Sequence, residues 1–462
     1  MFRFRRRARA GSGECFAVNL RGPSSLMKQW LILILLAIAT PMHGQQPSSL
    51  QAARQAMEAK DYSAAEQLYR KALGETPPSS PAFADVETDL GLSLQMQGRS
   101  ADAMHYYALA LKARYVPETY ALLAEEKCRM GELDSLRPML DRIYREERKN
   151  LRVLSAVAPC YLNIDKPIES VEVYNALLSS KDEPEDLVLI QLAKSYIQSG
   201  QFFAGRLSKT PGSEPFLAAL RQASSGGPEG ARGAFAEAAR MSPNFRADLS
   251  WPEAIDRWRQ HPQDVTLLYL LSVLSAEAGM RQIEVCDEKY PASPYLEQFH
   301  ADALADQGQG DEAAAEYQEL MRKYPGLPDL AFSLGVLEEK RGEWDKAAQA
   351  FRLQLTQYPR DERASEHLSS CMLQMGQYAD VRELLQPQVR AEHPPQWASL
   401  DLAEAEQKLG DSNAAIRILV AAEHEPNPPK QVHYRLMHLY SMTGRPADAK
   451  REYALFQAAS GQ

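Results

Sequence analysis

The chain has 462 residues, 45% of them hydrophobic and 24% charged, so it holds enough apolar side chains to bury a core and is not disordered as a whole. Its 52 lysines and arginines against 61 aspartates and glutamates give a formal charge of −9 at pH 7, which argues against a general phosphate-binding surface and therefore against nucleic acid as a partner. A chain of this length forms either two or three ordinary domains or one long array of repeats.

Residues 27–44 have the layout of a secretory signal peptide. They read MKQWLILILLAIATPMHG, in which Lys28 precedes an apolar run over residues 30–39. This run is about half of the roughly 20 residues that a membrane-spanning helix requires. We therefore predict a cleaved signal, cut after Gly44 or Ala39, and an exported protein that is periplasmic or secreted. A permanent membrane anchor is the alternative.

Residues 1–25 precede this segment and contain three consecutive arginines, Arg5 to Arg7. We interpret them as an upstream extension, with the true start at Met27, rather than as an overlong basic n-region. A nucleic-acid-binding arm and a twin-arginine signal are both disfavoured, because no phenylalanine-leucine-lysine element follows the arginines. Residues 1–44 thus form an N-terminal extension with a signal peptide, whose removal leaves a more acidic chain.

A first array of repeats is predicted over residues 45–202. Apolar stripes at helical spacing alternate with turn residues, and the copies follow one another at steps of 33 to 35 residues. Small and aromatic residues recur at matching places in each copy, and glycines such as Gly98, Gly131 and Gly200 fall where one helix should end. The recurring residues are Lys60, Asp61, Tyr62, Ala65, Tyr69, Ala72, Pro77, Leu90, Gly91, Gly98, Ala103, Tyr107, Leu123, Ala124, Gly131, Val157, Ala158, Tyr161, Tyr174, Leu192, Ala193, Tyr196 and Gly200.

Residues 203–263 depart from this pattern. The stretches KTPGSEP and SSGGPEGARG interrupt it with turn residues, while three segments at 216–224, 232–241 and 251–260 still have helical character. We interpret this region as degenerate helical repeats that kink the array or separate two arrays. A flexible linker is the disfavoured alternative, because the helical segments contain aromatic residues of the buried type.

A second array, over residues 264–462, repeats with a step of 34 residues. Its copies are marked by Gly308, Gly342, Gly376, Gly410 and Gly444. Each glycine should end a first helix in a left-handed conformation. A proline or polar segment then stops the second helix about 17 residues later.

The copy around Gly342 predicts an antiparallel hairpin. Gly335 and Ala347 are small residues at the point where its two helices touch, and Phe351 fills the gap to the next hairpin. One hairpin alone could not bury these apolar stripes, so neighbouring hairpins must stack. The two stripes are Leu330, Leu334 and Leu337 before the turn, and Trp344, Ala347, Ala348, Phe351 and Leu355 after it.

This pattern resembles the tetratricopeptide repeat, a 34-residue unit with Leu-Gly in its first helix, Ala and an aromatic residue in its second, and Pro near its end. The resemblance covers about 80% of the mature chain. It implies an all-α fold, an α-solenoid in which antiparallel hairpins wind into a right-handed superhelix that binds peptides or protein surfaces on its concave face. The matching residues in one copy are Leu334, Gly335, Gly342, Ala347, Phe351 and Pro359.

The cysteines give no zinc or disulfide signature. Cys128, Cys160, Cys286 and Cys371 are widely spaced, and no CxxC pair exists. Each falls in a predicted helix, where a small buried residue belongs, so we expect free, packed thiols. A bridge between Cys128 and Cys160 in neighbouring repeats is the main exception.

No catalytic motif is present: phosphate loop, GxSxG, HExxH and cysteine-histidine signatures are all absent from the sequence. His433 and His438 lie five residues apart on one predicted helix, whereas helical metal-binding pairs usually lie four apart. We therefore expect no enzyme activity, no cofactor and no metal, and a partner that is a protein or peptide.

First-helix positions that are not needed for the core should line the inner groove and meet a ligand. We expect Trp397 and Tyr434 to act as anchors, with Arg363 and Arg435 positioning acidic or backbone groups of the partner. The full set is Tyr269, Tyr295, Phe299, Phe332, Arg363, Glu366, His367, Trp397, Tyr434, Arg435 and His438.

The predicted function is a non-enzymatic interaction scaffold of the cell envelope. The alternatives are a periplasmic chaperone or regulatory subunit that binds client peptides, and an enzyme whose site lies in the irregular residues 203–262.

Overall fold

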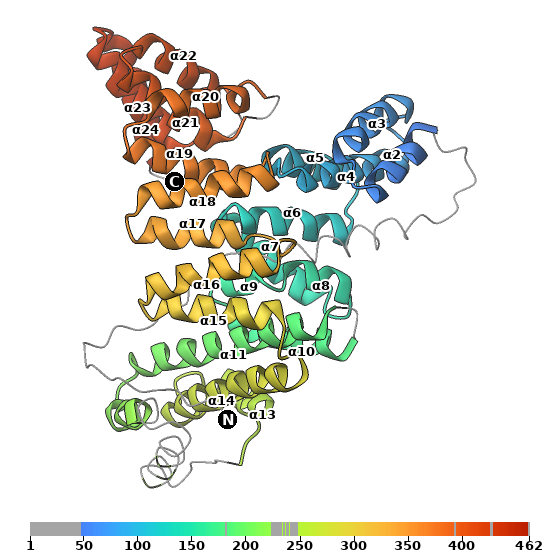
Figure 1. Ribbon diagram of the computed structural model, residues 1–462, viewed down its shortest axis with the longest axis vertical. Coiled ribbons are helices and arrows are strands. Elements are labelled where there is room, and N and C mark those ends of the chain that lie inside the picture. The colour runs from blue at the N-terminus through green and yellow to red at the C-terminus, as the bar shows by residue number, and fades with distance from the viewer. Residues whose placement is uncertain are drawn as a thin grey trace. The chain divides into compact units, whose positions relative to one another are not determined.

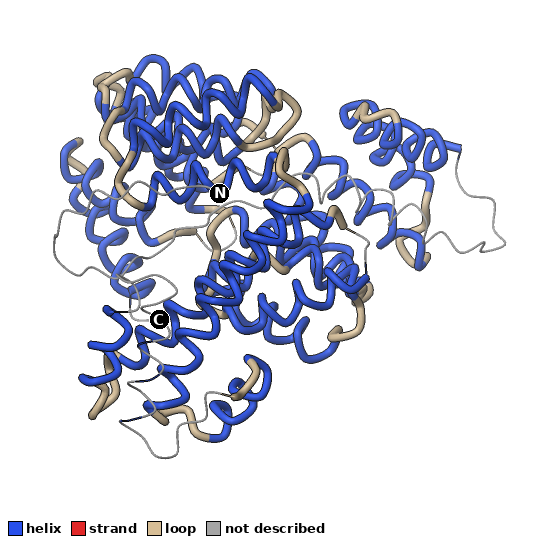
Figure 2. The backbone as a smooth tube through the Cα atoms, turned by 60° about the horizontal axis from the view of Figure 1, so that its bottom comes forward, coloured by secondary structure: helices blue, strands red, loops and turns tan. Residues whose placement is uncertain are grey.

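The computed structural model describes residues 48–180, 183–222, 248–391, 394–425 and 428–460, and the single residues 233, 236 and 240. These residues form helices joined by turns and contain no strand, which confirms the all-α, repeat-solenoid fold class (Figure 2). The expected signal segment at 27–44 and nearly all of the expected helix at 232–241 lie outside the described residues.

The described residues form two compact units. We call residues 158–299 the middle unit, and residues 48–157 together with 300–460 the split unit. These bounds differ from 202/203 and 263/264, where the repeat pattern becomes irregular. The boundaries between packing units therefore do not coincide with the boundaries between regular and irregular repeats.

The split unit consists of successive helical hairpins (Figure 1). Its first segment contains α2 (Ser48–Glu58), α3 (Tyr62–Glu75), α4 (Pro81–Met96), α5 (Ser100–Ala113), α6 (Pro117–Arg129), α7 (Leu133–Glu146) and α8 (Leu151–Val157). Its second segment continues from α15 (Pro294–Asp306), where the boundary falls, through α16 (Gly310–Lys323), α17 (Leu330–Lys340), α18 (Trp344–Gln357), α19 (Glu362–Gln374), α20 (Tyr378–Val389), α21 (Gln396–Lys408), α22 (Ser412–Glu423), α23 (Lys430–Met442) and α24 (Pro446–Ser460).

The glycines at 34-residue steps form the turns of these hairpins. Gly308, Gly342, Gly376, Gly410 and Gly444 have φ angles of 76°, 75°, 72°, 91° and 71°. This left-handed conformation is costly in free energy for any residue that has a side chain. It lets the chain pass from one helix to the next through only three residues. The predicted hairpin boundaries are confirmed at all five positions.

The hairpins are held together by the predicted small and aromatic residues. Ala347 and Phe351 of α18 are fully buried and pack with Ala364 and Leu368 of α19 in one hydrophobic cluster. A second hydrophobic cluster, which includes Leu419 and Leu436, contains residues of all four helices from α21 to α24. Since each second helix contributes to the cluster of the next hairpin, the stacking that the sequence requires is present.

The middle unit does not follow the expected hairpin pattern. It contains α9 (Cys160–Asn163), α10 (Pro167–Ser180), α11 (Glu185–Leu207), α13 (Trp251–Gln260) and α14 (Val265–Lys289). The helix α11 continues through Gly200, so the turn expected there is wrong. The reason is a close helix contact: a Cβ on Gly200 would lie 3.1 Å from the Ser272 backbone oxygen, and one on Gly279 would lie 2.9 Å from Ile197 Cγ1. These glycines let two long helices approach, rather than letting one of them end.

The two segments of the split unit meet where α5 and α19 begin. The Ala101 backbone N–H donates to the Glu362 carboxylate at 3.2 Å, and Arg360 Nη1 donates to Gln97 Oε1 at 2.6 Å. No side chain of the preceding turn caps α5. Glu362 therefore caps a helix from a distant part of the chain.

Cys128 and Cys160 are both disulfide-bonded, whereas Cys286 and Cys371 are free and buried. The expectation of free thiols is therefore wrong at the first two positions and confirmed at the other two.

In the described part of the chain, no helix combines the length and the apolar character needed to cross a membrane.

Candidate functional site

The eleven residues expected in the groove are distributed over the interior and the surface. Four are buried: Tyr269, Tyr295, Phe332 and Arg363 are 0%, 8%, 6% and 8% exposed. Tyr269 packs against Phe216, with ring centroids 5.5 Å apart. These four side chains support the packing of the helices and are not presented to a ligand.

Arg363 is held inside the split unit by two carboxylates. Its Nη2 atom lies 2.9 Å from Asp329 Oδ1 and 3.0 Å from Asp361 Oδ2, and its guanidinium stacks 4.5 Å from the centre of the Phe332 ring. Burial opposes its charge, but the two aspartates outweigh burial and raise the pKa of Arg363. Arg363 therefore does not have the predicted role of positioning a partner's acidic groups.

Arg435 is likewise occupied. Its Nη2 atom forms an ion pair with Glu404 Oε2 at 2.9 Å, and its Nη1 atom donates to the Leu400 backbone oxygen at the same distance. Both contacts join α23 to α21. Arg363 and Arg435, which were expected to contact a partner, thus form ion pairs that connect neighbouring repeats.

Half-buried polar residues, some of them outside the expected set, lie on the first helices of successive hairpins and are linked by contacts between these helices. His367 Nδ1 lies 2.6 Å from Glu339 Oε2, which joins α19 to α17, and Ser369 Oγ donates to Asp401 Oδ2 at 2.8 Å, which joins α19 to α21. We call this surface the first-helix face. It consists of Glu339, Glu366, His367, Asp401, Glu404 and Arg435.

The first-helix face is acidic, and its carboxylates are poorly compensated. Burial, then the charges of Asp401 and Glu339, raise the pKa of Glu366, although His367 opposes them. Burial, and to a smaller extent the charge of Glu404, also raise the pKa of Asp401, although the hydrogen bond from Ser369 and the charge of Arg435 oppose this rise. Glu366 makes no hydrogen bond or ion pair with any described residue. Four carboxylates thus face one arginine and one histidine, and a further cation would be favoured there.

Repeat register shows why the sequence argument missed part of this face. Asp401 occupies the place of His367 one step earlier and of Arg435 one step later. Glu404 occupies the place that His438 has one step later. Aromatic and arginine side chains are the types enriched at binding hot spots, so a prediction from residue type omits Asp401 and Glu404, whereas the repeat spacing identifies them.

Aromatic residues continue the surface toward the last hairpin. Tyr434 is 46% exposed, and its ring lies 4.5 Å from that of His438 and 5.7 Å from that of Phe456. Trp397, by contrast, is half-buried and packs on the core cluster of α17 to α21. The two predicted anchors therefore differ: Tyr434 is accessible, whereas Trp397 supports the packing. Phe299, outside this surface, is half-buried in the middle unit.

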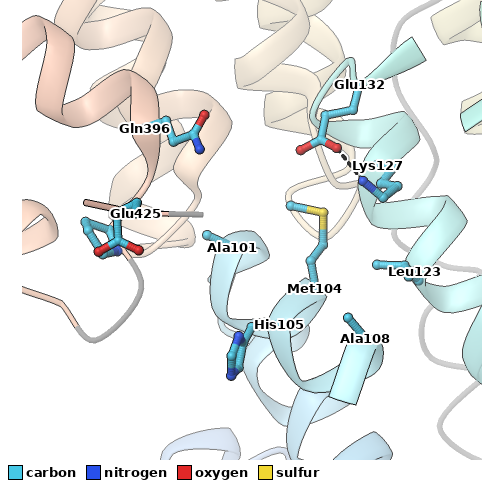
Figure 3. Close-up of a pocket in the computed structure, with 10 residues that line it drawn as sticks. Ala101, Met104, His105, Ala108, Leu123, Lys127, Glu132, Gln396 and Glu425 are labelled. Carbon is cyan, nitrogen blue, oxygen red and sulfur yellow. Dashed lines mark hydrogen bonds and ion pairs between the residues drawn. The ribbon is translucent and has the colours of Figure 1, made fainter. Parts of the chain in front are cut away.

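A pocket of about 330 Å³ lies in the split unit between α5, α6 and the helices around residues 394–425 (Figure 3). Met104 and Leu123 are its main apolar side chains, and the ion pair of Lys127 with Glu132 lies at its edge. These two charges neutralise one another, and Glu425 is the one further acidic side chain of the lining, so the pocket offers little charge with which to recognise a ligand. It is a weaker candidate than the first-helix face.

Comparison with known proteins agrees with the repeat pattern. Residues 300–362 match the family described as Tetratricopeptide repeat. A search of curated proteins returned no match.

Three solved structures are similar at low identity. The Cut9–Hcn1 hetero-tetramer of the APC/C is 14% identical, with 94% of this chain and 96% of that chain covered at a TM-score of 0.30. A tetratricopeptide repeat protein from Parabacteroides merdae is 13% identical, with 85% and 97% covered at 0.25. Yeast Tom70 is 13% identical, with 90% and 95% covered at 0.28. The hairpins of the structure make the chain a helical-repeat protein, and its residues 300–362 are similar to the tetratricopeptide repeat.

Proposed function

We propose that this protein is an exported, non-enzymatic scaffold that binds a segment of a partner protein across the first-helix face. The observation that supports this most directly is the group of part-buried carboxylates, in which Glu366 and Asp401 have raised pKa values and Glu366 has no described partner. A lysine or arginine of the partner would supply the missing positive charge. The exposed ring of Tyr434 would add an apolar contact at the end of the face.

Export is supported by two features. The signal-like residues 27–44 favour secretion, and disulfide bonds such as those of Cys128 and Cys160 persist mainly in oxidising compartments. Mass spectrometry of the native N-terminus tests this proposal. A chain that keeps residues 1–26 and remains in the cytosol would refute it.

The binding proposal is tested by capture followed by mutation. Mature protein would be used to isolate partners from envelope extract, and the affinity of each partner would then be measured for Glu366→Gln and Asp401→Asn together. We expect the affinity of the wild type to depend steeply on salt. The affinity of the double variant should be about tenfold or more lower and should depend less on salt. Glu383→Gln is the matched control, because Glu383 is exposed on α20, a second helix. Equal affinity in all variants would move the site elsewhere.

The captured set also separates the scaffold from its alternative. A scaffold should retain a few discrete folded partners, whereas a chaperone or client-binding regulatory subunit should retain many unfolded chains that bind with little dependence on the two acids.

A further inference from the structure

Three metal-ligand side chains converge in the last two hairpins of the split unit. They are Glu423 at the end of α22, His433 in the first turns of α23 and Glu452 in α24, and one ligand atom of each lies within 4.8 Å of the others. The three helices are neighbours at the C-terminal end of the chain (Figure 1). Within the described residues this is the one group of three histidine, cysteine or acidic side chains that meets this distance.

The group is largely buried. Glu452 is 0% and His433 is 7% exposed, and Glu423 is half-buried beside them. A carboxylate placed fully inside a protein is costly unless a cation compensates it. His433 Nδ1 lies 2.9 Å from Glu452 Oε2, so the imidazole is already directed at the buried acid.

One cation is present, and it compensates only part of this charge. Arg451 donates from Nε and Nη2 to Glu452 Oε1, at 3.0 and 2.6 Å. Its side chain is 54% exposed, and it also lies near Asp448. Glu423 makes no hydrogen bond or ion pair with any described residue. Glu452 Oε2, His433 Nδ1 and the Glu423 carboxylate therefore face one another with no cation between them.

We propose that Glu423, His433 and Glu452 form a binding site for a divalent transition-metal ion of the zinc type. One imidazole and two carboxylates are a donor set that suits zinc, whereas magnesium and calcium prefer oxygen ligands alone. Two ligand atoms at tetrahedral angles around zinc lie roughly 3.3 Å apart, given metal–ligand distances of about 2.0–2.1 Å. The pair His433–Glu452 is close to that spacing, and a rotation of the Glu423 side chain completes the set.

The position of the site suggests its effect. Glu423 belongs to one hairpin and the other two ligands to the next, so an ion bound by all three would tie the last hairpin to its neighbour. Binding to the folded state alone would raise the melting temperature.

Spacing along the sequence pairs His433 with His438, but the fold separates them. His438 is exposed and contacts the Tyr434 ring, whereas His433 faces Glu452. His438 thus provides a matched control: the same residue type, on the same helix, outside the site.

The test uses tag-free mature protein stripped with a chelator. Zinc would be titrated by calorimetry, cobalt would be added to detect tetrahedral absorption bands, and thermal unfolding would be followed with and without zinc. We expect binding of one ion per chain, cobalt bands and a higher melting temperature in wild type and in His438→Ala. In Glu423→Gln the affinity for zinc should fall about a hundredfold. Loss of a residue that only supports a ligand commonly costs about 10- to 100-fold, and loss of a direct ligand should cost at least as much.

Glu423→Gln is the decisive variant, because its half-buried side chain at a helix end is not needed for the core. His433→Asn is the second variant and should also abolish the cobalt bands, provided that its helicity is unchanged. The proposal is overturned if wild type does not bind zinc, or if Glu423→Gln binds it as tightly as wild type. Loss of binding in His438→Ala would place the ion elsewhere and overturn it as well.

Discussion

Gly335 of α17 lies directly against the ring of Phe351 in α18: a Cβ atom on this glycine would come within 2.5 Å of Phe351 Cε1. The same relationship recurs in the first segment, where a Cβ on Gly91 would lie 2.7 Å from Tyr107 Cε1. Both rings are fully buried, so neither can move aside. The Leu-Gly pair and the aromatic residue 16 positions later are therefore two halves of one contact.

We predict that Gly335→Leu destabilises the protein by about 1–3 kcal/mol through overpacking, and that Gly335→Ala does so to a smaller extent. Urea unfolding followed by circular dichroism measures this. Gly205→Ala is the control, because Gly205 also lies within a helix but has nothing within 4 Å of its Cβ position. That variant should be neutral or slightly stabilising. Unchanged stability of Gly335→Leu would contradict the contact.

Glu362 should make stability depend on pH. Burial, and to a smaller extent Asp102 and Glu126, raise its pKa to about 8 from 4.5, although the Ala101 N–H and Arg129 oppose the rise. An acid with a raised folded-state pKa binds its proton more tightly in the folded than in the unfolded chain. The free energy of unfolding should therefore fall as pH rises from about 4.5 to about 8.

We predict that Glu362→Gln removes more than about 1 kcal/mol of this pH dependence, since one pKa unit corresponds to about 1.4 kcal/mol. The amide oxygen still accepts from Ala101, so α5 remains capped. Unfolding free energies at pH 5, 7 and 9 provide the measurement, with the exposed Glu383→Gln as control. Parallel pH profiles for Glu362→Gln and wild type would rule the effect out.

Equivalent aromatic positions should differ in their contribution to stability. Phe351 and Tyr453 occupy the same place in repeats three steps apart, but Phe351 is 0% and Tyr453 is 48% exposed. We predict that Phe351→Ala costs about 3–5 kcal/mol, whereas Tyr453→Ala costs less than about 1.5 kcal/mol. Denaturant midpoints decide the question, and similar losses in both variants would show that Tyr453 is covered in solution.

The two predicted anchors can be separated in one experiment. Tyr434→Ala should leave the melting temperature nearly unchanged and weaken partner binding by about thirtyfold if Tyr434 is a hot spot. Trp397→Ala should instead lower the melting temperature, because its ring packs on the core cluster. A Trp397→Ala variant that melts like wild type would show that the ring is not part of the core.

The hairpins of the split unit could be predicted from the sequence because each depends on local features. Gly342 and its four equivalents mark turns, and the apolar stripes fix the faces that touch. The middle unit could not be predicted in the same way. Gly200 has the same place in the repeat as a turn glycine, yet it lies inside α11. There the absence of a side chain allows the backbone of Ser272 to come close. Only the packing partner distinguishes these two uses of glycine.

The site was harder to predict than the fold. Arg363 and Phe332 are hot-spot residue types at first-helix positions, but whether such a side chain meets a ligand or a neighbouring helix depends on its contacts. Arg363 is bound by Asp361, two residues earlier, and by Asp329, one 34-residue step earlier. The repeat pattern gives Asp329 and Arg363 equivalent positions, but it does not show that the two side chains meet.

The hydrogen bond between Ala101 and Glu362 has a consequence for how the protein is made. In a simple array each repeat contacts only its neighbours, so the chain can fold as it leaves the ribosome. Here the start of α5 is capped by a residue 261 positions later. At a synthesis rate of about 5–20 residues per second, this helix end waits for tens of seconds before its cap exists. The first segment therefore completes its folding only after most of the chain has been translated, and a nascent chain released before Glu362 would expose the beginning of α5 to water.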